Sequence, residues 1–331
     1  MSRMPSPPLS PAAVTATAEP RRDDHVTARR LLRAGAIAAC VPYLALKVAW
    51  LAGSRIGIPE GSAALEHETL LKAANALTLL MDTGVIVLAL LLTCPWGRRA
   101  PSWLLVLPMW GAVGLLTPVI VGFPARLALG MLGATDAGHP ADGRPFLDEW
   151  VFTVVYSGFI VQGLALGALF VLYARGRWGH LWQGSAGDPA ARLRGRWPRG
   201  AAVAAAVLAV GQAGAHLVWS SGVRTGLPGA MAGRSGADAA VQEAAYVLYG
   251  AAAVAGIVLL LSRRAVPLWV PLLLTGVGSA ALGCWGGWLL TTGLVQRAAT
   301  PPAAITYAVQ VIIGLLVLAG GAHYFHRRST P

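Results

Sequence analysis

Long uncharged stretches alternate with short polar segments along most of this chain. Five stretches contain no Lys, Arg, Asp or Glu, namely 100–125, 150–174, 200–223, 265–296 and 298–326. A sixth stretch, 244–262, is just long enough to cross a membrane. Two more, 34–54 and 73–97, are long enough only if each includes one charged residue, Lys47 and Asp82 respectively. About 20 apolar residues are needed for a helix to cross the hydrocarbon core of a bilayer. The pattern therefore predicts eight transmembrane helices.

The composition supports this class. Hydrophobic residues make up 56% of the 331 residues and charged residues only 12%, whereas charged residues approach a quarter of a soluble domain. Alternating strand patterns are absent, which disfavours a transmembrane barrel. We therefore expect an all-α polytopic membrane protein whose main partner is the lipid bilayer. Three cysteines, Cys40, Cys94 and Cys284, are too few for a disulfide framework and are interpreted as packing residues.

The segment boundaries predict five parts. Residues 1–30 are rich in Pro, Ser, Ala and Thr and are expected to form a disordered cytoplasmic tail. Two four-helix membrane units follow, at 31–176 and 200–326, joined by a basic cytoplasmic linker at 177–199. A short cytoplasmic tail at 327–331 ends the chain. No segment is large enough for a soluble nucleotide-binding domain.

The net charge of +12 is interpreted as a sign of orientation. With eight helices both termini lie on one side, and the side richer in Lys and Arg faces the cytoplasm. Placing the amino terminus inside puts eighteen basic residues inside, seven outside and Lys47 within the membrane. We expect a bacterial plasma membrane protein with both termini in the cytoplasm. The basic linker, which contains Trp178, Trp182 and Trp197, is interpreted as a topology determinant and not as a nucleic-acid site.

An internal duplication is indicated by two matches in the same order. Residues 47–59 align without a gap with residues 216–228, and Arg98-Arg99 before one helix corresponds to Arg263-Arg264 before another. Five of the thirteen aligned positions are identical: Trp50 and Trp219, Gly53 and Gly222, Arg55 and Arg224, Gly57 and Gly226, Pro59 and Pro228. Because four helices are an even number, the two units are predicted to be parallel repeats. Gly163-x-x-x-Gly167 and Gly283-x-x-x-Gly287 are expected to allow close helix packing.

The segment from Lys47 or His216 through Trp, Gly, Gly and Pro resembles that of an uncharacterised bacterial membrane family, domain of unknown function 3995. The resemblance implies a four-helix unit that covers about half of this chain and occurs twice in it. It implies no activity. Lys47 departs from the pattern, because the family has a histidine where the second half has His216.

Lys47 and Asp82 are the first candidates for chemistry. A charge inside the bilayer costs about 2.5 to 3.5 kcal/mol on insertion scales, so such side chains usually find a partner inside the bundle. Each is the obvious partner of the other. The pair is either part of a polar pocket open to the outside or a structural lock between two helices.

His216 occupies the position of Lys47 in the second half, and Glu243, Tyr246 and Tyr249 are the residues expected to satisfy it. Haem is not expected, because His323 and His326 are predicted at the opposite end of the bundle. Arg55 and Arg224 could bind an anionic group, with Trp50 and Trp219 beside them, although interfacial snorkelling also explains them.

No metal site is predicted. The clusters Glu66-His67-Glu68 and Asp136-x-x-His139-x-x-Asp142 have suitable residue types but lack the spacing of a specific metal motif.

Three functions remain open at this point. The first is binding or permeation of a small solute through an outward-facing polar pocket formed by Lys47, Asp82 and His216. The second is a membrane-embedded enzyme acting on a lipid-linked substrate, with the same three groups as acid and base. The third is a non-catalytic accessory subunit that binds a membrane-protein partner. No cofactor is expected.

Overall fold

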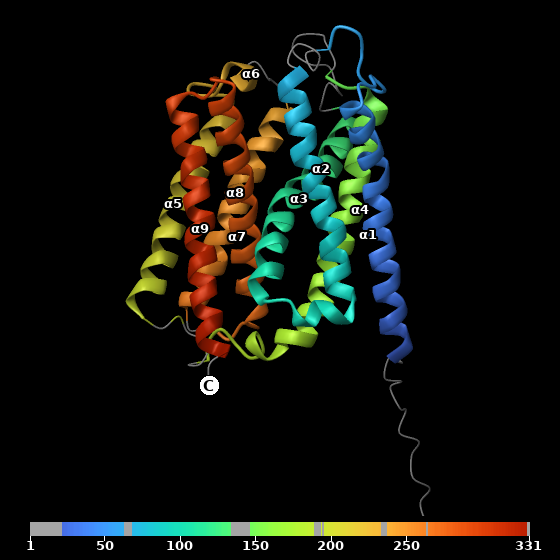
Figure 1. Cartoon of the computed structure of the whole chain (residues 1–331). Coiled ribbons are helices and arrows are strands. Elements are labelled where there is room, and N and C mark those ends of the chain that lie inside the picture. Colours follow the sequence, from blue (N-terminus) through green and yellow to red (C-terminus); the bar gives the residue numbers. More distant parts are fainter. Residues whose placement is uncertain are drawn as a thin grey trace, which may run out of the picture.

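The computed structural model describes residues 22–62, 68–133, 146–188, 193, 195–232, 237–262 and 264–329. Eight long helices in this part of the chain lie side by side in one bundle (Figure 1). All eight are long and apolar enough to cross a membrane, which confirms the predicted all-α, eight-span architecture. They are α1 (Arg22–Leu51), α2 (Glu68–Thr93), α3 (Ser102–Met131), α4 (Glu149–Trp178), α5 (Arg196–Ser220), α7 (Ala237–Leu261), α8 (Trp269–Val295) and α9 (Pro301–Ser329).

Three short elements connect the long helices. The 3₁₀ turns η2 (Pro95–Arg99) and η3 (Gly179–Leu181) lie at the end of the bundle where α1 begins, and α6 (Gly229–Ala232) lies at the opposite end (Figure 1). None of the three was predicted, since each is too short to carry a periodic pattern. In the described residues, β-pairing is limited to one isolated bridge between Ser185 and Pro267.

Several helices begin earlier than expected, α1 and α7 by the most residues. Helix α1 begins at Arg22, so the prediction of a disordered tail was wrong for residues 22–30. Helix α7 begins at Ala237, whereas the predicted span began at residue 244. The reason is the same in both cases. A charged residue ends an uncharged stretch, but Arg and Glu are good helix formers and continue the backbone hydrogen bonding. The linker is also shorter than predicted, because α4 ends at Trp178 and α5 begins at Arg196.

The helices pack in a related pattern in the two halves of the chain. In the first half α1 packs on α2 and α4, and α3 packs on α4. In the second half α5 packs on α7 and α9, and α8 packs on α9. The halves differ in two pairings. Helix α7 packs closely on α8 whereas α2 barely contacts α3, and α2 contacts α4 whereas α7 and α9 are not a packed pair. Helix α1 begins and α9 ends at the same end of the bundle (Figure 1).

The two halves meet mainly where α3 packs on α8. Gly114 of α3 allows this approach, because a Cβ at that position would collide with the carbonyl oxygen of Ala280 and lie 2.6 Å from Sγ of Cys284. One residue further along α3, the carbonyl oxygen of Leu115 accepts a hydrogen bond from the Trp285 indole at 3.1 Å. Small residues and one polar contact therefore join the halves, as is usual where lipid removes the hydrophobic driving force between helices.

The glycines of the two predicted packing motifs differ in their contacts. Gly163 lies against Ile120 of α3, and a Cβ at Gly283 would lie 3.1 Å from Cα of Gly314 in α9. These two contacts confirm the predicted packing role. Gly167 faces open space within 4 Å, so the prediction was wrong for that residue.

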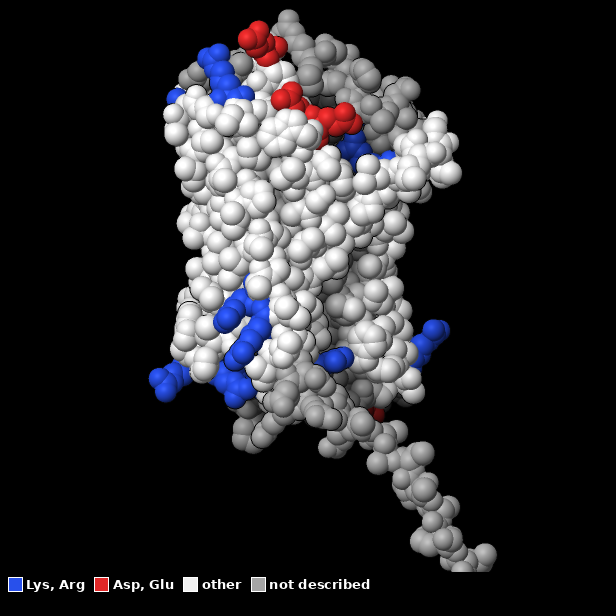
Figure 2. Space-filling model, turned by 90° about the vertical axis from the view of Figure 1, so that its right-hand side faces the viewer, with Lys and Arg blue, Asp and Glu red and all other residues white. Residues whose placement is uncertain are grey.

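The charged residues are separated by a wide uncharged band. On the face shown in Figure 2, Lys and Arg lie around one end of the bundle, most of the visible Asp and Glu lie at the other end together with further basic residues, and the band between them carries no charge. At the basic end Arg177 donates a hydrogen bond to the carbonyl oxygen of Ala100 at 2.9 Å and stacks on Trp178, which anchors the end of α4 to the start of α3. This distribution is that of a bundle whose middle lies in hydrocarbon.

The contact between the halves can be tested with a pair of glycine substitutions on α3. We expect Gly114→Ala to destabilise the protein by about 1 to 3 kcal/mol, because the added methyl group overpacks the contact with α8. Gly111→Ala is the matched control, since its Cβ would meet nothing within 4 Å and alanine favours the helix. Thermal unfolding of both variants in detergent measures the difference. Equal midpoints for the two variants would contradict the described packing.

Candidate functional site

The first buried polar site joins α1 to α2. Nζ of Lys47 lies 2.5 Å from Oδ2 of Asp82, which confirms the predicted pairing. The two side chains are 0% and 8% exposed. The ammonium group also lies 3.7 Å from the centre of the Tyr43 ring, one helical turn earlier on α1, where a cation–π contact adds to its stabilisation.

This geometry makes the first site compact and electrically balanced. One ammonium group faces one carboxylate, so the pair has no net charge when both groups are ionised. Replacing both members of such a pair by apolar residues is often tolerated, whereas removing one member leaves an unpaired charge inside the protein. In the described state the pair is covered, and the outward-facing pocket predicted around Lys47 is not open there.

The second buried polar site centres on His216 of α5. Nδ1 of His216 lies 2.6 Å from Oε2 of Glu243 on α7, and the imidazole ring stacks on Tyr246 with ring centres 4.5 Å apart. Both contacts confirm predicted partners. Tyr249, the third predicted partner, contacts Tyr246 instead, and its buried hydroxyl has no hydrogen-bond partner in the structure.

Two glutamines that the sequence interpretation missed complete the second site. Nε2 of Gln310 on α9 lies 2.8 Å from Nε2 of His216 and 3.1 Å from Oε1 of Gln212 on α5. Gln310 is 0% exposed, and its Oε1 atom has no partner. Their signal was present in the sequence, since each glutamine lies in the middle of a stretch without charged residues. A search restricted to charged residues overlooks such amides.

The segments 47–59 and 216–228 form the same turn, one after α1 and the other after α5, and the residues that they share are part of it. The Trp50 indole donates a hydrogen bond to the carbonyl oxygen of Ile56 at 2.8 Å, and the Trp219 indole donates one to Thr225 at 3.1 Å. Gly53 and Gly222 both have a positive φ, of 92° and 96°, which favours glycine. Each tryptophan thus closes the turn that follows its own helix.

The second glycine of each turn fastens it to the fourth helix of its half. The carbonyl oxygen of Gly57 accepts a hydrogen bond from the backbone N–H of Asp148, just before α4. The carbonyl oxygen of Gly226 accepts one from the hydroxyl of Thr300, just before α9. Both glycines again have a positive φ, and a Cβ on Gly226 would lie 2.9 Å from Pro302. The shared tryptophan and the two shared glycines therefore serve the turn itself.

The remaining candidate residues lie outside the two buried sites. Arg55 is exposed and Arg224 half-buried, each within its turn. The side chains of Glu66-His67-Glu68 and the segment Asp136 to Asp142 lie outside the described residues. Within the described residues no group of His, Cys, Asp and Glu could hold a metal ion. His323 lies about 20 Å along α9 from Gln310 at 1.5 Å per residue and packs on Trp197.

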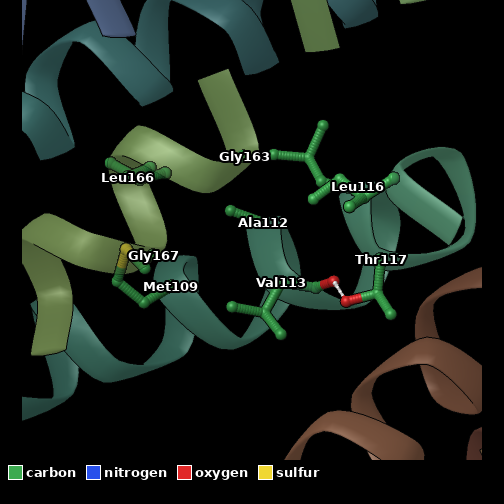
Figure 3. A pocket seen from close by; sticks show the side chains of 9 residues that line it. Met109, Ala112, Val113, Leu116, Thr117, Gly163, Leu166 and Gly167 are labelled. Carbon is green, nitrogen blue, oxygen red and sulfur yellow. Dashed lines mark hydrogen bonds between the residues drawn. The ribbon is translucent and has the colours of Figure 1, made fainter. Parts of the chain in front are cut away.

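The structure describes a groove between α3 and α4 (Figure 3). Its polar member, Thr117, donates its hydroxyl to the carbonyl oxygen of Val113 at 2.6 Å, so it offers no free donor. The groove contains none of the residues of the two polar sites. It is lined by Met109, Ala112, Val113, Leu116, Thr117, Ile120, Gly163, Leu166 and Gly167.

The structure does not bring Lys47 and His216 together. The described contacts of Lys47 are with Asp82 and Tyr43, and those of His216 are with residues of α5, α7 and α9. The candidates therefore form two polar sites, one in each half of the chain.

No protein-family model, curated protein sequence or solved structure matches this chain. The two buried sites are therefore the features that indicate a function.

Proposed function

We propose that this multi-pass membrane protein binds a small solute, or lets it permeate, at its two buried polar sites. The observation that supports the proposal is that each half buries an ionisable pair between its first and second helices. In each pair the member on the first helix, Lys47 or His216, lies three residues before the tryptophan that closes the turn. Ionisable groups inside a membrane bundle are costly and commonly mark substrate or proton paths. In the described state both pairs are covered, so entry of a solute requires α1 to part from α2, or α5 from α7.

A tandem duplication of a four-helix unit is part of this proposal. It is supported by the shared turns, by their hydrogen bonds to the fourth helix and by the packing of the first helix on the second and fourth in each half. We also propose that the repeated unit is related to the family of domain of unknown function 3995, on the residues from Lys47 and His216 to Pro59 and Pro228. Parallel repeats would place both sites at the same depth.

The proposed orientation puts both termini in the cytoplasm of a bacterial cell, with the turns after α1 and α5 outside. In a variant without Cys40, Cys94 and Cys284, we expect a membrane-impermeant thiol reagent to label Ser54→Cys and Val223→Cys in intact cells. Arg98→Cys is the control on the basic face and should label only after the cells are opened. Labelling of Arg98→Cys alone in intact cells would reverse the proposed orientation.

The chemistry of the first site indicates which solute to try first. When Lys47 and Asp82 part, a small zwitterion offers a carboxylate to the ammonium group and an ammonium group to the carboxylate, so neither charge stays unpaired. Radiolabelled glycine is therefore a suitable probe in proteoliposomes. We expect saturable uptake by the unmodified protein.

The control for uptake is the double variant Lys47→Met/Asp82→Leu, which replaces the pair by apolar residues and leaves no buried charge. We expect thermal unfolding to show that this variant is folded. Its glycine uptake should be at least about 10-fold lower than that of the unmodified protein, which corresponds to about 1.4 kcal/mol. Equal uptake by both proteins would contradict a role of the pair in solute binding.

A structural role in an accessory subunit is the second candidate. It is favoured by one observation, the complete burial of Lys47 against Asp82. On this hypothesis both proteins would be equally inactive in uptake, and the unmodified chain would co-purify with a membrane-protein partner. The enzyme hypothesis needs Lys47, Asp82 and His216 to converge on one substrate, and the separation of the candidates into two sites disfavours it.

A further inference from the structure

We infer that the second polar site is a proton-binding site, in which the carboxylate of Glu243 takes up the proton and the two glutamines keep His216 neutral. The inference deepens the proposed function, on which it depends for its biological meaning, by naming a ligand for one of the two sites. It follows from the direction of each hydrogen bond in the network.

The direction is set by two backbone carbonyl groups. Nε2 of Gln212 lies 3.2 Å from the carbonyl oxygen of Ala209 and 3.5 Å from that of Tyr246. A carbonyl oxygen only accepts hydrogen bonds, so the amide nitrogen of Gln212 faces these oxygens and its Oε1 atom points the other way. Gln212 therefore presents an acceptor to Gln310.

Gln310 then determines which nitrogen of His216 accepts a hydrogen bond. Because Oε1 of Gln212 accepts, Nε2 of Gln310 is the atom that faces it, at 3.1 Å. The same nitrogen lies 2.8 Å from Nε2 of His216 and donates its other hydrogen there. Nε2 of His216 is thus an acceptor without a hydrogen. A hydrogen on that atom would point at an N–H group of Gln310.

The tautomer of His216 follows. The neutral ring carries its hydrogen on Nδ1 and donates it to Oε2 of Glu243 at 2.6 Å. Reversal of the Gln310 amide would offer Oε1 to a protonated Nε2, but it would also set that oxygen against Oε1 of Gln212. The network therefore opposes a second proton on His216.

The charge of the second site then differs from that of the first. Lys47 balances Asp82, whereas a neutral His216 leaves the carboxylate of Glu243 with an uncompensated negative charge. In the part of the chain that the structure describes, the other titratable groups next to this carboxylate are Tyr246 on α7 and Tyr307 on α9. Of the other helices that pack on α7, α8 contains no charged residue or histidine, and α3 contains one charged residue, Arg126. An unbalanced buried charge is costly, and a proton removes it.

The proton reaches the carboxylate from water at the end of the bundle where α7 begins. Glu243 lies six residues from the start of α7, and its side chain is 10% exposed. Hydronium transfers a proton to the carboxylate, which yields a carboxylic acid and water. The hydrogen bond from Nδ1 of His216 persists, because the protonated carboxyl group keeps an oxygen that accepts.

Infrared difference spectra of the purified full-length protein, acidic minus neutral, test this inference. We expect a carboxylic acid C=O band that disappears in Glu243→Gln, a variant of the same shape that keeps an oxygen for Nδ1 of His216. The double variant Lys47→Met/Asp82→Leu is the matched control and should retain the band. Persistence of the band in Glu243→Gln would overturn the assignment.

Nitrogen NMR of the imidazole side chains provides the second readout, with the His216 signal assigned by its loss in His216→Asn. We expect Nε2 of His216 to stay unprotonated while the carboxyl band appears. In Gln310→Leu the obstacle to a second hydrogen is gone, so His216 is expected to become an imidazolium at acidic pH. An imidazolium at His216 in the unmodified protein, formed before the carboxyl band, would overturn the inference.

Neither readout requires a transported solute. A protein that shows the band but takes up no glycine would therefore count against the proposed uptake and leave the proton site standing. A protein that takes up glycine without the band would do the reverse.

Discussion

The need to find partners for charged and amide groups inside the bundle governs this structure. In hydrocarbon there is no water to solvate an ammonium, carboxylate or amide group, so each must find a partner on a neighbouring helix. Lys47 and Asp82 meet this need as a pair of opposite charges between α1 and α2. His216 meets it through three helices, with Glu243 on α7 and Gln310 on α9. The polar contacts thereby determine which helices lie next to one another near these sites, while small residues determine how close they come.

The two sites find partners for their buried polar groups in different ways, and the protonation chemistry of the two sites can therefore differ. When the halves are aligned on Arg98-Arg99 and Arg263-Arg264, Asp82 corresponds to Val247 and Glu243 corresponds to Thr78. The acidic partner is therefore one helical turn nearer the start of its helix in the second half. The long side chain of Lys47 bonds directly to its acid. The shorter imidazole of His216 has two nitrogens to satisfy, and the second nitrogen requires the glutamine.

Much of this architecture could be predicted from the sequence, because its strongest signal is the cost of a charge in lipid. That cost separates the eight spans, makes Lys47 and Asp82 conspicuous and identifies them as partners. The prediction from charge placed the starts of α1 and α7 too late, because Arg22 and Glu243 belong to helices that extend past the uncharged stretch. Contacts that depend on three-dimensional packing could not be predicted. The contact of Gln310 with His216 joins residues 94 positions apart, and the approach of Gly114 to Ala280 depends on how the halves dock.

Lys47 and Asp82 are buried as a mutually dependent pair of charges, and a double-mutant cycle on the two residues tests this dependence most directly. We predict that Lys47→Met alone and Asp82→Leu alone each lower the free energy of unfolding by about 3 to 5 kcal/mol, because each leaves an unpaired buried charge. The double variant should recover most of that loss, since it removes both charges. If the two losses were simply additive in the double variant, the side chains would not depend on each other and the account would be contradicted.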